Sequence, residues 1–493
     1  MNRTVLAMFG SLAALVVAFA MLSRPNTSNN SQSKPLMLFC AASNRAVVEA
    51  IRADYEKEFG RTVQVQYGPS QTLLAAMEVA NTGDLYLPAD DSFLKIAKEK
   101  NLIAEVLPLA SMQAGVAVLK GNPKKIGLFN DLLKEEVRLV QANVEATAIG
   151  KITQEVLSSA QLWDAANKAT DAYRSSVTDV ANDVLVGAAD AGIVYDAVLH
   201  TYPGLEFVSL PELASVRSKV AVAVINASEQ PTAALHFARY LAASDRGGSR
   251  YEEFGFSAEK QESWSDVPEL AIFAGSMLRP AIDETITAFE KREGVKVTTV
   301  YNGCGILVAQ MKTGQLPDAY FACDKEFMSQ VKEYFPEPVD VSQNELVILV
   351  QKGNPMNIRS LKDLTREGVR VGIGHEKQCA MGWITQNTFR EGGIQKDVMA
   401  NVTVQTPTGD MLVNQLRAKS LDAAVAYLSN AAGAAEHLDA VQITGIECSV
   451  ATQPWAIASK SKYPLTASRL FERICSADSQ DAFLAEGFRW QKK

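Results

Sequence analysis

The sequence predicts an α/β protein made of two tandem copies of one unit. Each unit is expected to have two lobes with mostly parallel sheets around a cleft. Strand-like and helix-like segments alternate along each half of the chain, which favours parallel strands buried between helices. The same order of segments returns after about 230 residues, and similarity at a fixed offset indicates an internal repeat. Each copy has about 225 residues, which is large for one compact core and typical of two lobes.

The composition is that of an ordinary globular protein and excludes several classes of function. Of the 493 residues, 47% are hydrophobic, and the net charge is −8. This acidic balance lacks the basic footprint of nucleic-acid-binding proteins, so no nucleic acid partner is predicted. Small anions remain possible ligands, because backbone N–H groups can hold them without lysines. The six cysteines contain no C-x-x-C pair and the chain has only four histidines, so neither a zinc site nor a disulfide-rich scaffold is expected.

Residues 1–24 are predicted to be a signal peptide or an N-terminal membrane anchor. An uncharged run at 5–23 lies between two arginines, and residues 18–20 offer a small-x-small cleavage site. The run also approaches the roughly 20 residues that span a bilayer, so both alternatives stay open. In either case the rest of the chain is expected to be periplasmic or otherwise extracytoplasmic. Residues 25–35, rich in asparagine and serine, are predicted to form a flexible spacer.

The first unit is expected over residues 36–258. An apolar run enters a small-residue turn at Ser43, and the helix-period segment after it ends near Gly60, where a left-handed C-cap would sit. A β-branched run typical of a strand follows, and a later buried strand ends at Tyr195. The expected elements, in order, are a strand and turn at 36–43, a helix at 46–59, a strand at 62–67, a turn at 68–71, a helix at 72–79, a segment at 84–90, and a turn and strand at 187–195.

The second unit is expected over residues 268–490, after a polar linker at 259–267 that a proline closes. Its segments repeat those of the first unit in the same order, which chance similarity would not maintain over such a length. The repeated segments are a strand and turn at 270–276, a helix at 281–293, a strand at 295–301, a turn at 302–305, a helix at 306–312, a segment at 318–324 and a turn and strand at 420–427.

Small or hydroxyl-bearing residues recur where strands meet helices, at four places in each unit. Helix N-termini carry free N–H donors and a positive dipole end, so several of them in one cleft would bind an ionised oxyanion through neutral donors. Hydroxyl groups add further donors. The alternative for each single serine is an ordinary helix N-cap. The places are Ser43, Ser70, the Ala148 loop and Tyr195 in the first unit, and Ser276, Cys304, the Ala380 loop and Tyr427 in the second.

Each unit resembles the periplasmic molybdate-binding protein family, the solute receptors of molybdate and tungstate ABC importers. The first unit has the family's Ala-Ala-Ser start at 41–43, its Tyr-Gly-x-Ser turn at 67–70 and its Lys-Gly-Asn-Pro segment at 120–123. The second unit is similar more loosely. The resemblance implies tandem type II periplasmic-binding-protein units, each of which clamps an oxyanion, molybdate or tungstate, between two lobes. It also implies an ABC importer permease as the partner, and no cofactor.

The resemblance also assigns binding residues in both units. The first pocket would use the hydroxyl groups of Ser43, Ser70 and Tyr195 and backbone donors at Ala148 and Val177. The second would use Ser276, Tyr427 and backbone donors at Ala380 and Gly409, with Cys304 in place of the family's second serine.

The cysteine at 304 matters because a thiol is a weak donor, and a thiolate would repel an oxyanion. Cys304, Cys323 and Cys379 fall on segments that the fold would bring toward one cleft. A disulfide, a soft-metal site and simple packing are all open for them.

Three classes of function compete. The leading hypothesis is an exported solute-binding protein that captures an oxyanion for an ABC importer. The alternatives are a membrane-anchored sensory or scaffolding protein with one degenerate receptor unit, and a receptor for another small anion. An enzyme is not expected, because the sequence has no Ser-His-Asp set, no Gly-x-Ser-x-Gly motif, no phosphate loop and no metal-ligand cluster of standard spacing, so neither catalytic nor metal-binding residues are assigned.

Overall fold

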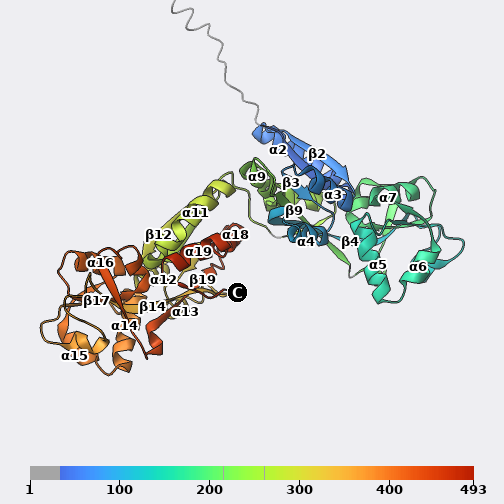
Figure 1. Cartoon of the computed structure of the whole chain (residues 1–493). Coiled ribbons are helices and arrows are strands. Elements are labelled where there is room, and N and C mark those ends of the chain that lie inside the picture. Colours follow the sequence, from blue (N-terminus) through green and yellow to red (C-terminus); the bar gives the residue numbers. More distant parts are fainter. Residues whose placement is uncertain (1–33, 215, 260, 493) are drawn as a thin grey trace, which may run out of the picture.

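The computed structural model describes residues 34–214, 216–259 and 261–492. Two α/β units follow one another along the chain, the first coloured blue to green and the second yellow to red (Figure 1). The expected leader at 1–24 and most of the spacer at 25–35 lie outside the described residues. Within the described part of the chain, no helix is both long and apolar enough to cross a membrane.

The first unit is built on one sheet of ten strands, in the order β2-β1-β3-β9-β4-β7-β5-β6, with β8 and β10 beside β4. Its strands are β1 (Leu36–Ala41), β2 (Val63–Gly68), β3 (Leu85–Leu87), β4 (Ile103–Leu119), β5 (Leu139–Ala142), β6 (Thr170–Arg174), β7 (Ala191–Tyr195), β8 (Leu205–Val208), β9 (Arg217–Ile225) and β10 (Ser257–Ala258). Its helices are α2 (Arg45–Phe59), α3 (Ser70–Ala80), α4 (Ser92–Glu99), α5 (Ala148–Ser159), α6 (Trp163–Ala169), α7 (Val177–Leu185), α8 (Pro211–Ala214), α9 (Pro231–Ala242) and α10 (Ser249–Glu253).

The long strand β4 divides the first unit into two lobes. Its start pairs antiparallel with β9, and its end pairs antiparallel with β7 and β8. The first lobe therefore contains β1, β2, β3, β9 and the start of β4, and the second lobe contains β5 to β8 and the end of β4. Parallel pairs form the outer part of each lobe, β1 with β2 and β3, and β5 with β6 and β7. The predicted α/β class is confirmed, and the sheets are mixed because the chain crosses between lobes on β4 and β9.

The second unit repeats this architecture strand for strand, in the order β12-β11-β13-β19-β14-β17-β15-β16. Its strands are β11 (Glu269–Gly275), β12 (Lys296–Asn302), β13 (Ala319–Phe321), β14 (Val339–Gln351), β15 (Val371–Gly374), β16 (Val402–Thr406), β17 (Ala423–Tyr427), β18 (Leu438–Gln442), β19 (Val450–Ile457) and β20 (Arg489–Trp490). Its helices are α11 (Arg279–Glu293), α12 (Cys304–Lys312), α13 (Lys325–Ser329), α14 (Ala380–Glu391), α15 (Gln395–Asn401), α16 (Gly409–Arg417), α17 (Leu428–Ala432), α18 (Pro464–Ile474) and α19 (Ala477–Ala485).

Local sequence signals explain where the matching helices α2 and α11 end. Each is followed by a glycine in the left-handed conformation, Gly60 with φ 65° and Gly294 with φ 65°. A residue with a side chain is strained at such an angle, so glycine ends the helix at low cost. The chain then turns into β2 or β12, which lies parallel to the strand before the helix. The ends of the two strands in this strand–helix–strand unit form part of the first-lobe wall of each cleft.

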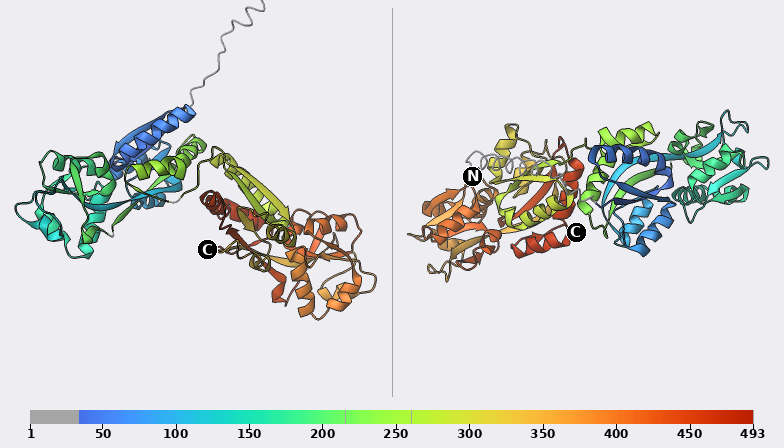
Figure 2. Two further views of the ribbon diagram at one scale, coloured as in Figure 1. Left: turned by 180° about the vertical axis from the view of Figure 1, so that it is seen from behind. Right: turned by 90° about the horizontal axis from the view of Figure 1, so that it is seen from above.

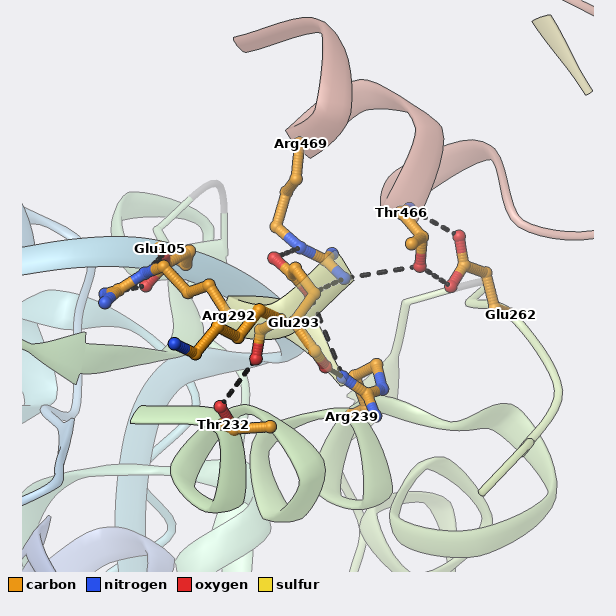
Figure 3. Close-up of polar contacts among 9 residues, drawn as sticks. Glu105, Thr232, Arg239, Glu262, Arg292, Glu293, Thr466 and Arg469 are labelled. Atoms are coloured by element: carbon orange, nitrogen blue, oxygen red, sulfur yellow. Dashed lines mark hydrogen bonds and ion pairs between the residues drawn. The ribbon is translucent and has the colours of Figure 1, made fainter. Parts of the chain in front are cut away.

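The two units meet through their first lobes at a buried ion cluster (Figure 3). Glu293, the last residue of α11, is 1% exposed, and its carboxylate accepts hydrogen bonds from Arg469 of α18 at 2.8 and 3.0 Å. Arg239 of α9, in the first unit, donates to the backbone carbonyl of Glu293. Glu262 of the linker accepts hydrogen bonds from the N–H and hydroxyl of Thr466, both at 2.8 Å. The three views show the units as separate bodies that come close to each other near this junction (Figures 1 and 2).

Candidate ligand-binding cleft

The cleft of the first unit contains a small, partly open hollow between its two lobes. The first lobe contributes the ends of β1 and β2 and the start of α3, and the second lobe contributes the starts of α5 and α7 and the end of β7. The lining includes all five residues that the sequence singles out in this unit, Ser43, Ser70, Ala148, Val177 and Tyr195. These residues come from five separate segments, so the fold alone brings them together.

Two serines of the first lobe present hydroxyl protons to the hollow. Ser70 is the first residue of α3 and is 2% exposed, and its Oγ accepts a hydrogen bond from the N–H of Ala89 at 3.1 Å. Ser43 lies just after β1, and its Oγ accepts from the side-chain amide of Asn44 at 3.3 Å. Because each oxygen already accepts a hydrogen bond from the protein, its own proton remains for a ligand.

The second lobe contributes two helix N-termini. Thr147 caps α5 by accepting from the N–H of Gly150 at 3.1 Å, and Ser176 caps α7 by accepting from the N–H of Asp179 at 3.1 Å. The first N–H groups of these helices, at Ala148 and Val177, have no acceptor within their own helix. Both helices also direct the positive ends of their dipoles at the hollow. The two capping residues line the hollow as well, and the Thr and Ser before each helix-period segment are the signal that could have predicted them.

Tyr195 ends β7 and closes the hollow from the second lobe. The residue is 1% exposed, and within the described part of the chain its hydroxyl forms no hydrogen bond of ordinary geometry, although the Ser218 side chain lies close enough to lower its pKa against the effect of burial. Burial raises the pKa of Tyr195 well above its usual value, so the hydroxyl stays protonated and neutral. A buried hydroxyl without a partner is costly and rare in native proteins. A ligand acceptor inside the hollow would supply the missing partner.

Every side chain that lines the hollow is uncharged. The polar groups that remain free are hydroxyl and backbone donors, and no carboxylate is among the lining residues. This set of groups matches an anion with several acceptor oxygens, since each oxygen can take a donor without a fixed cation nearby. A cationic ligand would find few acceptors there.

The second unit carries the corresponding residues on the corresponding elements, with one shift of register. Cys304, Ala380 and Gly409 begin α12, α14 and α16, and Tyr427 ends β17. Tyr427 is 2% exposed, and among the described residues its hydroxyl has no hydrogen-bond partner. Ser276, however, is the first residue of the turn after β11, as Ala42 is after β1. The residue equivalent to Ser43 is therefore Met277.

Strand pairing explains this register. Phe39 of β1 pairs with Tyr86, and Phe273 of β11 pairs with Tyr320, which places Ser276 one residue earlier than its match by residue type suggests. Ser276 therefore stands in the place of Ala42, a residue that also lines the hollow of the first unit.

The three cysteines of the second cleft are in two different states, a disulfide and a free thiol. Cys304 and Cys323 form a disulfide at the places that Ser70 and Ala89 occupy in the first unit. Cys379 is a free thiol that caps α14, as Thr147 caps α5, and burial raises its pKa to about 11. Among the residues that the structure describes, no group of three or more His, Cys, Asp or Glu side chains could hold a metal ion.

The fold and the two-lobed clefts define a class of proteins, the receptors that enclose a small solute between two α/β lobes. The chain belongs to the bacterial extracellular solute-binding protein family, whose model matches residues 36–257 and again residues 270–489. The predicted resemblance and the tandem duplication are thus confirmed. Members of this family are solute receptors that deliver a ligand to an ABC permease, and they are not enzymes.

Relatives and solved structures match one unit at a time. A putative binding protein of Haemophilus influenzae is 27% identical over 228 residues, which cover 45% of this chain and 90% of the relative. The molybdate-binding protein ModA of Mycobacterium bovis is 26% identical over 257 residues, or 50% of this chain and 96% of the relative. A periplasmic molybdate-binding protein of Azotobacter vinelandii, with a solved structure, is 14% identical with a TM-score of 0.40 and covers 46% of this chain and 100% of its own.

Proposed function

We propose that the first unit captures a tetrahedral oxyanion, molybdate or tungstate, and delivers it to an ABC importer permease. The observation that carries the proposal is the hollow lined only by uncharged groups, with the unpartnered hydroxyl of Tyr195 inside it. Ser43 and Ser70 would bind the anion from the first lobe. The N–H groups of Ala148 and Val177 and the hydroxyl of Tyr195 would bind it from the second. Similarity to molybdate-binding relatives supports the choice of ligand.

Closure of the lobes would decide the selectivity. When the lobes meet around the anion, water is excluded and each hydrogen bond to the charge becomes stronger, because the local dielectric falls. Donors held at fixed positions then favour anions of one size over others. Molybdate and tungstate have longer metal–oxygen bonds than the sulfur–oxygen bonds of sulfate. A cage that matches the larger ions leaves sulfate with stretched hydrogen bonds.

Thermal unfolding with added ligand tests this function. A ligand that binds only the native state stabilises it by about 2.7 kcal/mol at 100 times its Kd. We therefore expect molybdate and tungstate to raise the melting temperature of the first unit, sulfate to raise it less, and sodium chloride of equal ionic strength to have no effect. If none of the three oxyanions changes the melting temperature, this function is wrong.

A membrane-anchored sensory or scaffolding role is the second candidate, and the changed second cleft favours it. That cleft has Met277 and a disulfide where the first cleft has two serine hydroxyls, as expected for a unit released from ligand binding. Uptake of molybdate in cells that lack the chain separates the two candidates. An import receptor is required for uptake at low molybdate concentration, whereas a sensor or scaffold is not.

A further inference from the structure

Four positions along the cleft have side chains in the first unit and are glycine in the second. The equivalences follow from the matching ends of β1 and β11 and the matching starts of the helices. A glycine at the start of a helix or the end of a strand often marks a close approach of other atoms. The pairs are Ala41 and Gly275, Pro69 and Gly303, Gln71 and Gly305, and Val177 and Gly409.

Two of these glycines let the lobes of the second unit touch. A Cβ atom at Gly303 would overlap the carbonyl oxygens of Gln378 and Pro407, and one at Gly305 would overlap the carbonyl oxygen of Lys377. The N–H of Gly305 also donates a hydrogen bond to the carbonyl oxygen of Gln378 at 3.0 Å. The glycines follow β12 in the first lobe, and Lys377 and Gln378 follow β15 in the second. One backbone hydrogen bond thus joins the two lobes directly across the cleft.

The first unit has no equivalent of this contact. In its described residues, no backbone hydrogen bond links positions 69–71 to the loop at 144–148. Pro69 and Gln71 stand where the second unit has glycines, and the side chain of Gln71 is exposed. Side chains at these two positions would keep the lobes from the approach that the second unit makes.

The other two glycines are covered by protein atoms inside the second cleft. A Cβ atom at Gly275 would overlap the sulfur of Cys323 and lie 3.3 Å from that of Cys304, so the disulfide packs against the end of β11. A Cβ atom at Gly409 would overlap the side-chain amide of Asn430, which is 9% exposed. These atoms take up space at the end of β11 and at the start of α16, beside the groups that would face an anion.

We propose that the second unit is held closed by its own lobes and takes no oxyanion, so that the chain binds a single ion in the first cleft. The proposal rests on the proposed function of the first unit for the nature of the ligand. The evidence for a closed second cleft does not depend on the first unit, because it comes from contacts within the second unit. Met277 and Cys304 stand where the first unit has the hydroxyls of Ser43 and Ser70, and Ser276 stands where it has Ala42. The N–H of Gly305 is engaged by Gln378, and four glycines admit protein atoms to the cleft.

Hydrogen exchange of the full chain, followed by mass spectrometry with and without molybdate, tests the proposal. We expect peptides that cover 303–306 and 376–380 to exchange slowly in both conditions, with no change on adding molybdate. Peptides that cover 68–72 and 146–150 should exchange more slowly with molybdate, and native mass spectra should show one ion per chain. Fast exchange at 303–306 without ligand, slowing there with molybdate, or two bound ions would each overturn the proposal.

The same experiment separates this proposal from the function of the first unit. If molybdate changes nothing anywhere, the oxyanion function of the first cleft fails. Slow exchange at 303–306 in that case still supports the closed second cleft, because it needs no ligand.

A substitution that forces the second lobes apart gives an independent check. Gly305→Gln installs the residue of the first unit, and its Cβ atom cannot coexist with the carbonyl of Lys377. Exchange in 376–380 should therefore become faster, while the matched variant Gln71→Ala leaves exchange in 146–150 unchanged. Gly305→Ala carries the same clash with a smaller side chain and replaces the first variant if that one does not fold. Unchanged exchange at 376–380 in a folded Gly305 variant would contradict the direct lobe contact.

Discussion

The hydroxyl of Tyr195 is the single group that most clearly points to a ligand in the first cleft. It is buried at the end of β7 and has no partner among the described residues, although five segments supply groups around it. Among the described residues the buried hydroxyls of Tyr251 and Tyr320 also lack a partner, so Tyr195 points to a ligand only together with the other free donors of the same hollow. Tyr427 is in the same situation at the end of β17, but the lobes around it bind each other through Gly305. The two tyrosines are therefore a matched pair in different surroundings.

We expect Tyr195→Phe to weaken molybdate binding roughly 10- to 100-fold, because a hydrogen bond to a charged group contributes about 1.5–3 kcal/mol. Tyr427→Phe is the matched control and should leave the affinity unchanged. The affinities of both variants are measured by calorimetric titration. Equal losses in the two variants would show that both clefts bind the ion.

The protonation of Tyr195 leads to a prediction about pH. Burial raises the pKa of Tyr195 above its usual value of about 10. A raised pKa keeps the donor intact below the usual value, and the donor is lost only as pH rises through the raised pKa. Tyr195 is the one titratable side chain among the described residues that line the hollow, and it does not titrate in the neutral range. Molybdate affinity should therefore be constant from pH 6 to pH 9, and a tenfold change across that window would implicate a charged group.

Residue type alone predicts a set of cleft residues in both units, and in the second unit the strand register differs from the match by residue type at one position. Ser43, Ser70 and Tyr195 could be picked out because each stands where a strand meets a helix or ends. Ser276 was matched to Ser43 by its identity, and the pairing of β11 shifts it by one residue. Register depends on contacts between strands that are distant in sequence, so local pattern cannot determine it.

At the scale of elements, β4 and its repeat β14 control the architecture. Each is a long strand whose start belongs to the first lobe and whose end belongs to the second. Alternating strands and helices predicted the parallel outer strands. They did not predict the antiparallel crossing strands, because pairing of these strands depends on segments more than 80 residues apart, such as β4 with β9.

The disulfide between Cys304 and Cys323 should stabilise the second unit alone. The two cysteines are 19 residues apart in sequence, and closing a loop of that size contributes about 3 kcal/mol. We expect a reductant to lower the free energy of unfolding of the second unit by about this amount, as measured by urea denaturation. The double variant Cys304→Ser and Cys323→Ala recreates the pair of the first unit and should no longer respond to reductant. A response that persists in the double variant would assign the effect to other cysteines.

At the scale of the whole molecule, the junction between the two units lies away from both clefts. The junction connects α9 of the first unit to α11 and α18 of the second through Arg239, Glu293 and Arg469 (Figure 3). These helices cover first-lobe sheets, so the second lobe of each unit remains free of the junction (Figure 1). The sequence predicted a linker at 259–267 but not this cluster, because its members are brought together from three distant segments.

We expect Glu293→Gln to destabilise the junction by about 3–5 kcal/mol, since it leaves the buried charge of Arg469 without its partner. Differential scanning calorimetry should show a lower melting temperature and a wider separation between the unfolding transitions of the two units. The control is Glu269→Gln, which removes one side of an exposed ion pair with Lys296 and should have almost no effect. Equal scans for the two variants would contradict a structural role for the cluster.

The most direct test of the whole account is a calorimetric titration of the full chain with molybdate. We expect saturable binding of one ion per chain, because uncharged donors converge in the first cleft and the second is closed. Absence of binding for both molybdate and tungstate would contradict the central claim that the first cleft holds an oxyanion.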